Sequence, residues 1–147
     1  MKIRIIFIIF LLLLTQFTFS QEINMIKDWD EAKTIATKEN KQILIILTGS
    51  EWCAPCRKMD KKVIAHHEFQ DYAKKNLVLF LIDLPGGGII YNSKVNQDYE
   101  KFKSKFQADA LPSLILTDKN GIKIKNLKGK MHRLKNVMKQ LKSNRSS

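Results

Sequence analysis

The sequence predicts a three-layer α/β domain, in which a mixed central sheet lies between two layers of helices. Two apolar runs, 42–48 and 77–84, are typical of strands buried on both faces, and a helical segment separates them. Strands joined through a helix run parallel, with a right-handed crossover. Two further strands, 113–117 and 122–127, flank Asn120-Gly121, a turn signal that favours an antiparallel hairpin. The predicted sheet therefore combines a parallel β-α-β unit with a C-terminal β-hairpin.

The helices are predicted from apolar residues that recur three or four positions apart. Asp28 is a suitable N-cap for the first helix, which ends near Asn40. The others are a helix from about Ala54 to His66-His67, a segment over 68–75, a helix from 93 or 95 to about 106, and a last helix carrying Leu134 to Leu141. This order of elements fills both layers around one sheet, as expected for a single domain.

Residues 1–20 have the layout of a secretory signal peptide. Lys2 and Arg4 precede ten apolar residues, Ile5 to Leu14, and small residues follow at the positions that a signal peptidase reads. Ten apolar residues are too few for a permanent membrane span. We therefore expect one domain over 21–147, periplasmic or secreted and not embedded in a membrane. The alternative is an N-terminal anchor that is retained.

The positive charge of the chain is unevenly distributed. The formal net charge is +12, yet residues 21–118 hold 14 basic and 14 acidic residues. From residue 119 onward the chain has ten Lys or Arg and no Asp or Glu. This basic C-terminal part favours acidic partners or anionic headgroups, or is simply a solvated lysine-rich face. It has no interleaved stacking aromatics, so nucleic acid is not an expected partner.

Both cysteines of the sequence lie in one pentapeptide, Trp52-Cys53-Ala54-Pro55-Cys56, at a predicted junction of strand and helix. A disulfide across so short a loop removes little chain entropy, so a structural role explains it poorly. A redox role fits better. A zinc site needs further ligands, and His66-His67, about ten residues along the helix, lie roughly 15 Å away. We therefore expect no metal.

Residues 48–58, TGSEWCAPCRK, closely resemble the active-site segment of thioredoxin-like proteins. Leu111-Pro112 ahead of a strand matches the cis-proline site that faces the disulfide in this family, and Gly129 before the last helix also fits. The resemblance covers essentially all of 21–147. It implies a thioredoxin-like fold and a thiol-disulfide oxidoreductase that needs no cofactor beyond its two thiols.

The resemblance and the helix position together suggest roles for the site residues. Cys53 lies at the start of a helix, where unpaired backbone N–H groups and the helix dipole favour a thiolate. We expect Cys53 to be the nucleophile and Cys56 the resolving thiol of a redox disulfide, Cys53–Cys56. The residues expected to face the substrate are Trp52, Ala54, Pro55, Leu111 and Pro112.

The sequence departs from thioredoxin at the position of a buried acid that helps move the proton of the second thiol. That position, six residues before Cys53, is Leu47. The lysine that partners this acid in thioredoxin is replaced by Leu79. The proton relay of thioredoxin is therefore missing. Glu51 or a bound water is the suggested replacement.

A glycine-rich loop, Gly86-Gly87-Gly88, follows the second strand. No Gly-Lys-Ser/Thr follows it, so it is not a phosphate site. Because the two parallel strands end at the same sheet edge, we expect this loop, with Ile89 to Tyr91, to shape access to Cys53. The alternative is a plain connector.

The expected function is an extracytoplasmic thiol-disulfide oxidoreductase that reduces substrate disulfides. Its partners are disulfide-containing or thiol proteins and a membrane-bound electron donor, since no soluble donor outside the membrane is implied. An oxidase or isomerase is one alternative, because redox direction depends on thiolate stabilisation that the sequence does not reveal. A thioredoxin-like binding module with incidental thiols is another.

Overall fold

The architecture is that of a computed structural model, which describes residues 23–86 and 93–144. The predicted signal peptide, 1–20, and the start of the predicted domain lie outside these residues. The elements are β1 (Met25–Ile26), α2 (Trp29–Glu39), β2 (Gln42–Thr48), α3 (Ala54–Met59), the π-helical turn η1 (Asp60–Ile64), α4 (His67–Asn76), β3 (Leu77–Asp83), α5 (Lys94–Phe106), β4 (Ser113–Thr117), β5 (Lys123–Asn126) and α6 (Leu134–Lys142).

The described strands form one mixed sheet in the order β1-β3-β2-β4-β5. The parallel β2–β3 pair and the antiparallel β4–β5 hairpin confirm the predicted topology. Antiparallel pairing of β2 with β4 joins the two units. In the parallel pair Thr48 lies opposite Asp83, so both strands end at one edge of the sheet. This edge carries the Cys53–Cys56 segment.

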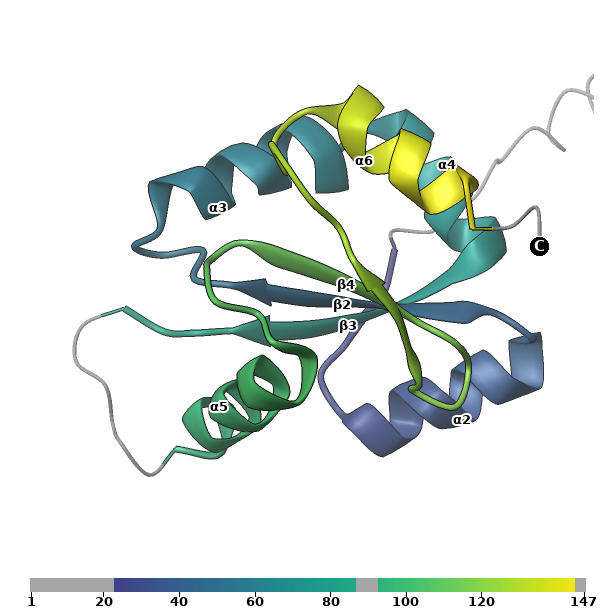
Figure 1. The fold of residues 1–147 in the computed structure, drawn as a ribbon, viewed down its shortest axis with the longest axis horizontal. Coiled ribbons are helices and arrows are strands. Elements are labelled where there is room, and N and C mark those ends of the chain that lie inside the picture. Colours follow the sequence, from purple (N-terminus) through teal and green to yellow (C-terminus); the bar gives the residue numbers. More distant parts are fainter. Residues whose placement is uncertain (1–22, 87–92, 145–147) are drawn as a thin grey trace, which may run out of the picture.

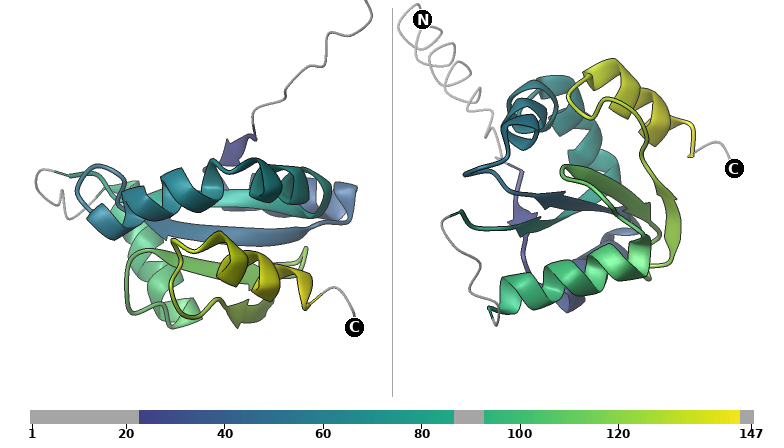
Figure 2. Two further views of the ribbon diagram at one scale, coloured as in Figure 1. Left: turned by 90° about the horizontal axis from the view of Figure 1, so that it is seen from above. Right: turned by 60° about the vertical axis from the view of Figure 1, so that its left-hand side comes forward.

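Helices cover both faces of the sheet, as predicted. Figure 1 shows α3, α4 and α6 on one side and α2 with α5 on the other. Seen from above in Figure 2, α3 and α4 follow one another in a row, and α6 lies beside that row. Each face has its own apolar core, one around Leu44, Met59 and Phe69 and the other around Ile45, Phe80 and Phe102.

Local sequence signals explain where the first helix begins and ends. The carboxylate of Asp28 accepts a hydrogen bond from the Glu31 N–H at 2.9 Å and caps α2. Asn40 ends α2 in a left-handed conformation, φ 52°, which asparagine tolerates better than most residues. Both boundaries agree with the sequence prediction.

The helix after the cysteines ends in a π-helical turn that the sequence did not predict. The turn η1 continues α3, and the side chain of His66 then caps α4 by accepting from the Glu68 N–H at 3.2 Å. The predicted interruption at His66-His67 is therefore confirmed. Its physical role is a helix cap.

The outer strands differ from expectation. The two-residue strand β1 pairs with β3 and was not predicted, because two residues carry no periodicity. In the hairpin, a register shift at Leu116 and Thr117 interrupts the alternation of faces, so Ile122 and Ile124 are 66% and 39% exposed. The predicted strand 122–127 is thus shortened to Lys123–Asn126, and its isoleucines point outward.

Among residues 23–86 and 93–144, no helix has both the length and the apolar character needed to cross a membrane.

We predict that Phe80→Ala lowers the free energy of unfolding by about 3–5 kcal/mol, because it leaves a cavity in the core. The Phe80 side chain is 1% exposed, and its ring centroid lies 5.0 Å from that of Trp29 and 5.1 Å from that of Phe102. Urea denaturation measures the loss. The exposed Ile122→Ala is the control and changes stability by less than about 0.5 kcal/mol; equal losses of stability in both variants contradict the burial of Phe80 in this core.

Candidate active site

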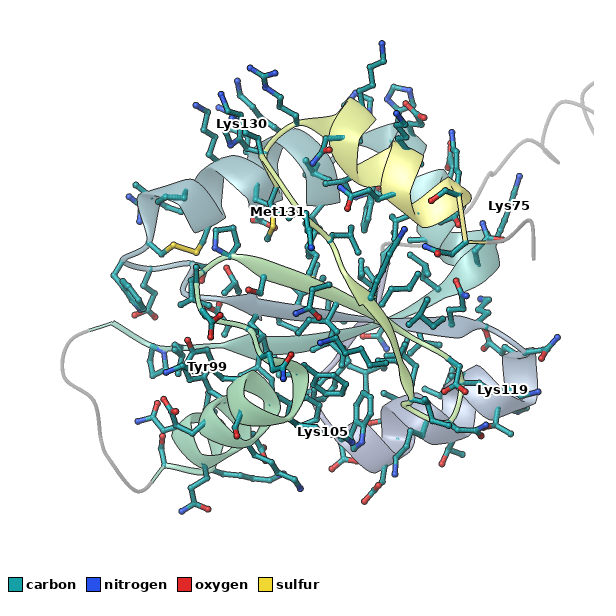
Figure 3. The ribbon with its side chains drawn as sticks, viewed as in Figure 1. Lys75, Tyr99, Lys105, Lys119, Lys130 and Met131 are labelled. Atoms are coloured by element: carbon teal, nitrogen blue, oxygen red, sulfur yellow. A yellow bond between two sulfur atoms is a disulfide. The ribbon has the colours of Figure 1, made fainter. Side chains whose placement is uncertain are left out.

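The two cysteines form a disulfide at the start of α3. The Cys53–Cys56 S–S distance is 2.03 Å, and the two Cα atoms lie 5.2 Å apart. Cys53 is 7% exposed and Cys56 is fully buried. Figure 3 shows the sulfur–sulfur bond at the N-terminal end of this helix. Cys53 is thus the more accessible residue of the pair.

Cys53 is the N-cap of α3. Its Sγ accepts a hydrogen bond from the Cys56 N–H at 3.3 Å, and its own N–H donates to the Gly49 carbonyl at 2.8 Å. Pro55 occupies the first turn, where its missing N–H removes no intrahelical bond. A negative charge on Cys53 Sγ therefore faces the positive end of the helix dipole.

The loop between β2 and α3 is tied to the end of β3 by a carboxylate. The backbone N–H of Ser50 donates to Asp83 Oδ1 at 2.7 Å, and its hydroxyl donates to Asp83 Oδ2. The Leu84 N–H also donates to the Thr48 carbonyl at 2.9 Å. These bonds fix the direction in which the chain enters the cysteine segment.

Trp52 is exposed but held in place. Its side chain is 52% exposed, and the indole Nε1–H donates to the Leu84 carbonyl at 3.0 Å. The ring lies against Gly49, where an added Cβ would meet ring atoms at 2.6 to 2.9 Å. A side chain at position 49 therefore requires displacement of the indole.

Glu51 links the same loop to the glycine-rich segment. Its Oε2 accepts a hydrogen bond from the Gly86 N–H at 2.7 Å, and its backbone carbonyl accepts from the Arg57 guanidinium at 3.0 Å. A Cβ on Gly86 would lie 3.5 Å from Trp52 Cδ1. Gly86 is thus adjacent to Trp52, whereas the rest of the predicted access loop, 87–91, lies outside the described residues.

Leu111-Pro112 lies at the same edge of the sheet as the cysteines. The bond between these residues is cis, as the resemblance implied. Pro112 directly precedes β4, in which Ser113 pairs with Leu47 near the end of β2. Because β2 leads through Gly49 into Cys53, the pairing brings the cis-proline segment close to the cysteine segment.

Leu47 and Leu79 are both buried, but they do not lie together. Leu47 is in the core on the α2 and α5 face, and Leu79 is in the core on the opposite face. The β3 residue paired with Leu47 is Ile82, also buried. The expected pairing of position 47 with position 79 is therefore wrong. Leu79 lies three positions before Ile82, and residues an odd number of positions apart in a strand point to opposite faces of the sheet. The position of the thioredoxin acid is apolar all the same.

An acidic pair lies close to the cysteine helix. Burial, followed by the negative charge of Asp83, raises the pKa of Asp60 above its ordinary value of 3.8. Asp60 follows Cys56 by one helical turn, at the junction of α3 and η1. Asp83 thus accepts hydrogen bonds from the loop before Cys53, and its charge acts on the Asp60 carboxyl at the end of the cysteine helix.

The side chains of the described residues 23–86 and 93–144 include no group of three or more His, Cys, Asp or Glu arranged to hold a metal ion. His66 and His67 stack on one another with ring centroids 4.4 Å apart, and His66 Nδ1 is engaged by the Glu68 N–H.

The family is decided by comparison with known proteins. A family model described as a thioredoxin-like domain matches residues 29–143, which is most of the chain. The chain belongs to the thioredoxin-like family. The matched range includes the cysteine segment, the cis-proline segment and every described element except β1.

Individual relatives agree with this assignment. A curated relative, "Disulfide bond reductase DsbH" of Chlamydia pneumoniae, is 25% identical over 95 residues, 65% of this chain. The chain spans 57% of that relative's length. A solved structure described as "DsbH Oxidoreductase" superposes with a TM-score of 0.70 at 23% identity, covering 88% of this chain and 90% of that one. A thioredoxin from Thermus thermophilus gives 0.62 at 13% identity, covering 84% and 88%. These structures support the thioredoxin-like fold.

Sequence reasoning missed the anchoring of the cysteine loop by Asp83. The sequence offered one signal, an acid at the end of a predicted parallel strand, close in space to the end of the cysteine strand. The partner, Ser50, lies 33 residues earlier, and only the strand register identifies it.

We predict that Asp83→Ala lowers the free energy of unfolding by about 2 kcal/mol, because two hydrogen bonds to a charged acceptor are lost. Ser50→Ala removes only the hydroxyl donor and loses about half as much. Urea denaturation of the oxidised protein measures both. A larger loss in Ser50→Ala than in Asp83→Ala contradicts the proposed anchor.

We also predict a pH-dependent effect of Asp60→Asn. Because the pKa of Asp60 is raised on folding, the folded protein binds this proton more tightly than the unfolded chain does. Stability is therefore lost as the pH rises from below 3.8 through the folded-state pKa. Asp60→Asn removes this loss, so the free energy of unfolding of the variant minus that of the wild type is larger at pH 7 than at pH 3. Denaturant titrations across this range test it, and a difference independent of pH contradicts it.

Proposed function

We propose that the protein is an extracytoplasmic thiol-disulfide oxidoreductase that reduces disulfides in protein substrates. The observation that carries this proposal is the Cys53–Cys56 disulfide at the N-terminus of α3, with the more exposed cysteine at the N-cap. Membership of the thioredoxin-like family and the relative named as a disulfide bond reductase support it.

In the first step the thiolate of reduced Cys53 attacks one sulfur of the substrate disulfide. A Cys53–substrate disulfide forms, the substrate S–S bond breaks, and the second substrate sulfur leaves as a thiolate that takes a proton. The N–H of Cys56 and the dipole of α3 stabilise the attacking thiolate.

In the second step Cys56 loses its proton and attacks Cys53 Sγ, which releases the other substrate thiol. Two electrons have then passed to the substrate, and Cys53–Cys56 is oxidised, the state that the structure contains. An electron donor must return two electrons and two protons. We assign this role to a membrane-bound donor, because the proposed location offers no cytosolic reductant.

Contact with the substrate is assigned to the exposed surface around Cys53. Trp52 supplies an apolar surface held by the Leu84 carbonyl, and Ala54 and Pro55 are exposed beside it. The backbone at Leu111 and Pro112, ahead of β4, is available to an extended substrate segment at the same sheet edge. Residues 1–20, with their basic head and apolar run, support export.

The cysteine roles are tested with two variants. We predict that Cys53→Ser abolishes reduction of a peptide disulfide, because the hydroxyl is not ionised at neutral pH. Cys56→Ser instead accumulates a Cys53–substrate disulfide, since no second thiol resolves it. Mass spectrometry of the reaction mixture detects the adduct. Retained activity of Cys53→Ser contradicts the nucleophile assignment, and binding of a partner unchanged in both variants favours a binding module.

Redox direction is tested by the equilibrium reduction potential of the Cys53–Cys56 pair. For a reductase we expect a value nearer to the approximately −270 mV of thioredoxin than to the approximately −120 mV of the oxidant DsbA. Titration against glutathione or dithiothreitol, followed by mass spectrometry of alkylated thiols, measures it. A value at the oxidising end overturns the reductase assignment in favour of an oxidase or isomerase.

A further inference from the structure

Five cationic or titratable side chains gather on the outer side of the layer formed by α3 and α6. We call this set the basic patch; its members are Lys58, Lys62, Lys130, His132 and Arg133. They come from two segments that are far apart in the sequence, the cysteine helix with η1 and the loop that precedes α6. The lysines and the arginine are exposed, and His132 is half-buried.

The two segments meet at one apolar core, to which Met131 contributes. The Met131 side chain packs against the core that contains Met59 of α3 and Val63 of η1. Lys130 and His132 flank Met131 in the sequence, so this packing brings them to the side of the sheet that α3 and η1 cover. Figure 3 shows Lys130 on the outer side of this layer, among other side chains that end in nitrogen.

The electrostatics of His132 agree with this arrangement. Desolvation lowers the pKa of His132, and the charges of Lys58, Arg133, Lys130 and Lys62 lower it further, in that order. Four cations from both segments thus act on one imidazole, so the patch concentrates positive charge.

Acidic side chains do not neutralise this charge within the described part of the chain. The ion pairs there engage Lys33, Lys41, Lys103 and Lys142, and none engages a cation of the basic patch. Asp60 is the single acid over 54–64, and the carboxylate that acts on it is Asp83. Residues 119–147 contain no acid at all.

The basic patch begins beside the redox pair. Lys58 lies five residues after Cys53 and Lys62 nine, so at about 1.5 Å per residue they are roughly 8 and 14 Å along the axis from the start of α3. A polypeptide that places a disulfide at Cys53 therefore reaches the patch with three to five further residues, at about 3.3 Å per extended residue.

We propose that the basic patch is a docking surface for an acidic segment that flanks the reactive disulfide of a protein partner. This inference rests on the proposed function and names a class of substrate or donor for it. Complementary charge accelerates encounter and orients the partner before thiol exchange begins.

A protein segment fits this surface better than a lipid membrane does. A membrane that covers the patch would also lie over α3 and restrict the approach of a substrate disulfide to Cys53. Interfacial binding also needs apolar side chains to insert beside the cations. Of the large apolar residues exposed in the described ranges, only Trp52 is next to the cysteine helix; the others are Val95, Ile122 and Ile124.

The test uses the reduced protein and three peptides that share one intramolecular disulfide and differ only in their flanks, which are four Glu, four Gln or four Lys. Stopped-flow fluorescence or quenched-thiol mass spectrometry gives the second-order rate of reduction. The patch variant is Lys58→Gln, Lys62→Gln and Lys130→Gln together. The matched control, Lys38→Gln, Lys74→Gln and Lys75→Gln, removes three exposed lysines that lie elsewhere. For each peptide, dividing the reduction rate of the variant by that of the wild type cancels the intrinsic reactivity of the peptide.

At low salt we expect the patch variant to reduce the Glu-flanked peptide about 10-fold more slowly than the wild type, the scale of electrostatic steering. Its rate with the Gln-flanked peptide stays within about twofold, and the control variant is close to wild type with both. The wild-type preference for Glu flanks disappears near 1 M salt, where the screening length is about 3 Å.

If the patch and control variants lose the same fraction of the reduction rate with the Glu-flanked peptide, the inference is overturned, because net charge alone then explains the effect. Reduction of the Gln-flanked peptide with no preference for Glu flanks overturns the inference and leaves the proposed function standing. No reduction of any peptide overturns the proposed function and the inference with it. Sedimentation with phosphatidylglycerol vesicles completes the test: patch-dependent vesicle binding without a peptide preference assigns the patch to a membrane and contradicts the proposal.

Discussion

The parallel pairing of β2 with β3 is the constraint on which the site depends. It places Thr48 opposite Asp83, so the segments that follow β2 and β3 leave the sheet side by side. The Asp83 carboxylate then holds the Ser50 turn, and the neighbouring Leu84 carbonyl holds the indole of Trp52. Without this register the N-terminus of the cysteine helix would have no fixed position relative to the sheet edge.

Much of the fold could be predicted because its central elements carry strong local signals. The run of isoleucine and leucine in β2 is long enough to identify a strand buried on both faces, and Asp28 marks a helix start. Asn120-Gly121 identifies the hairpin, with Gly121 at φ 83°. The position of the disulfide at a strand-to-helix junction followed from the same signals, since the pentapeptide contains both cysteines.

The remaining features depend on contacts between distant residues or on a local irregularity. The Asp83 anchor joins positions 33 residues apart, and the face of Leu79 follows from a strand register that hydrophobicity does not encode. The exposed isoleucines of the hairpin result from a register shift. The gathering of Lys130 and Arg133 near the cysteine helix depends on tertiary packing of the loop before α6, whereas the sequence showed only a basic C-terminal part.

The immobilised indole of Trp52 has a consequence for the thermodynamics of encounter. An exposed aromatic side chain ordinarily loses rotamer freedom when a partner binds it. Here the Leu84 carbonyl and the bare backbone of Gly49 have already restricted that freedom during folding. The apolar surface beside Cys53 is therefore preorganised, so little side-chain entropy remains to be lost in the transient partner contact that the proposed thiol exchange requires.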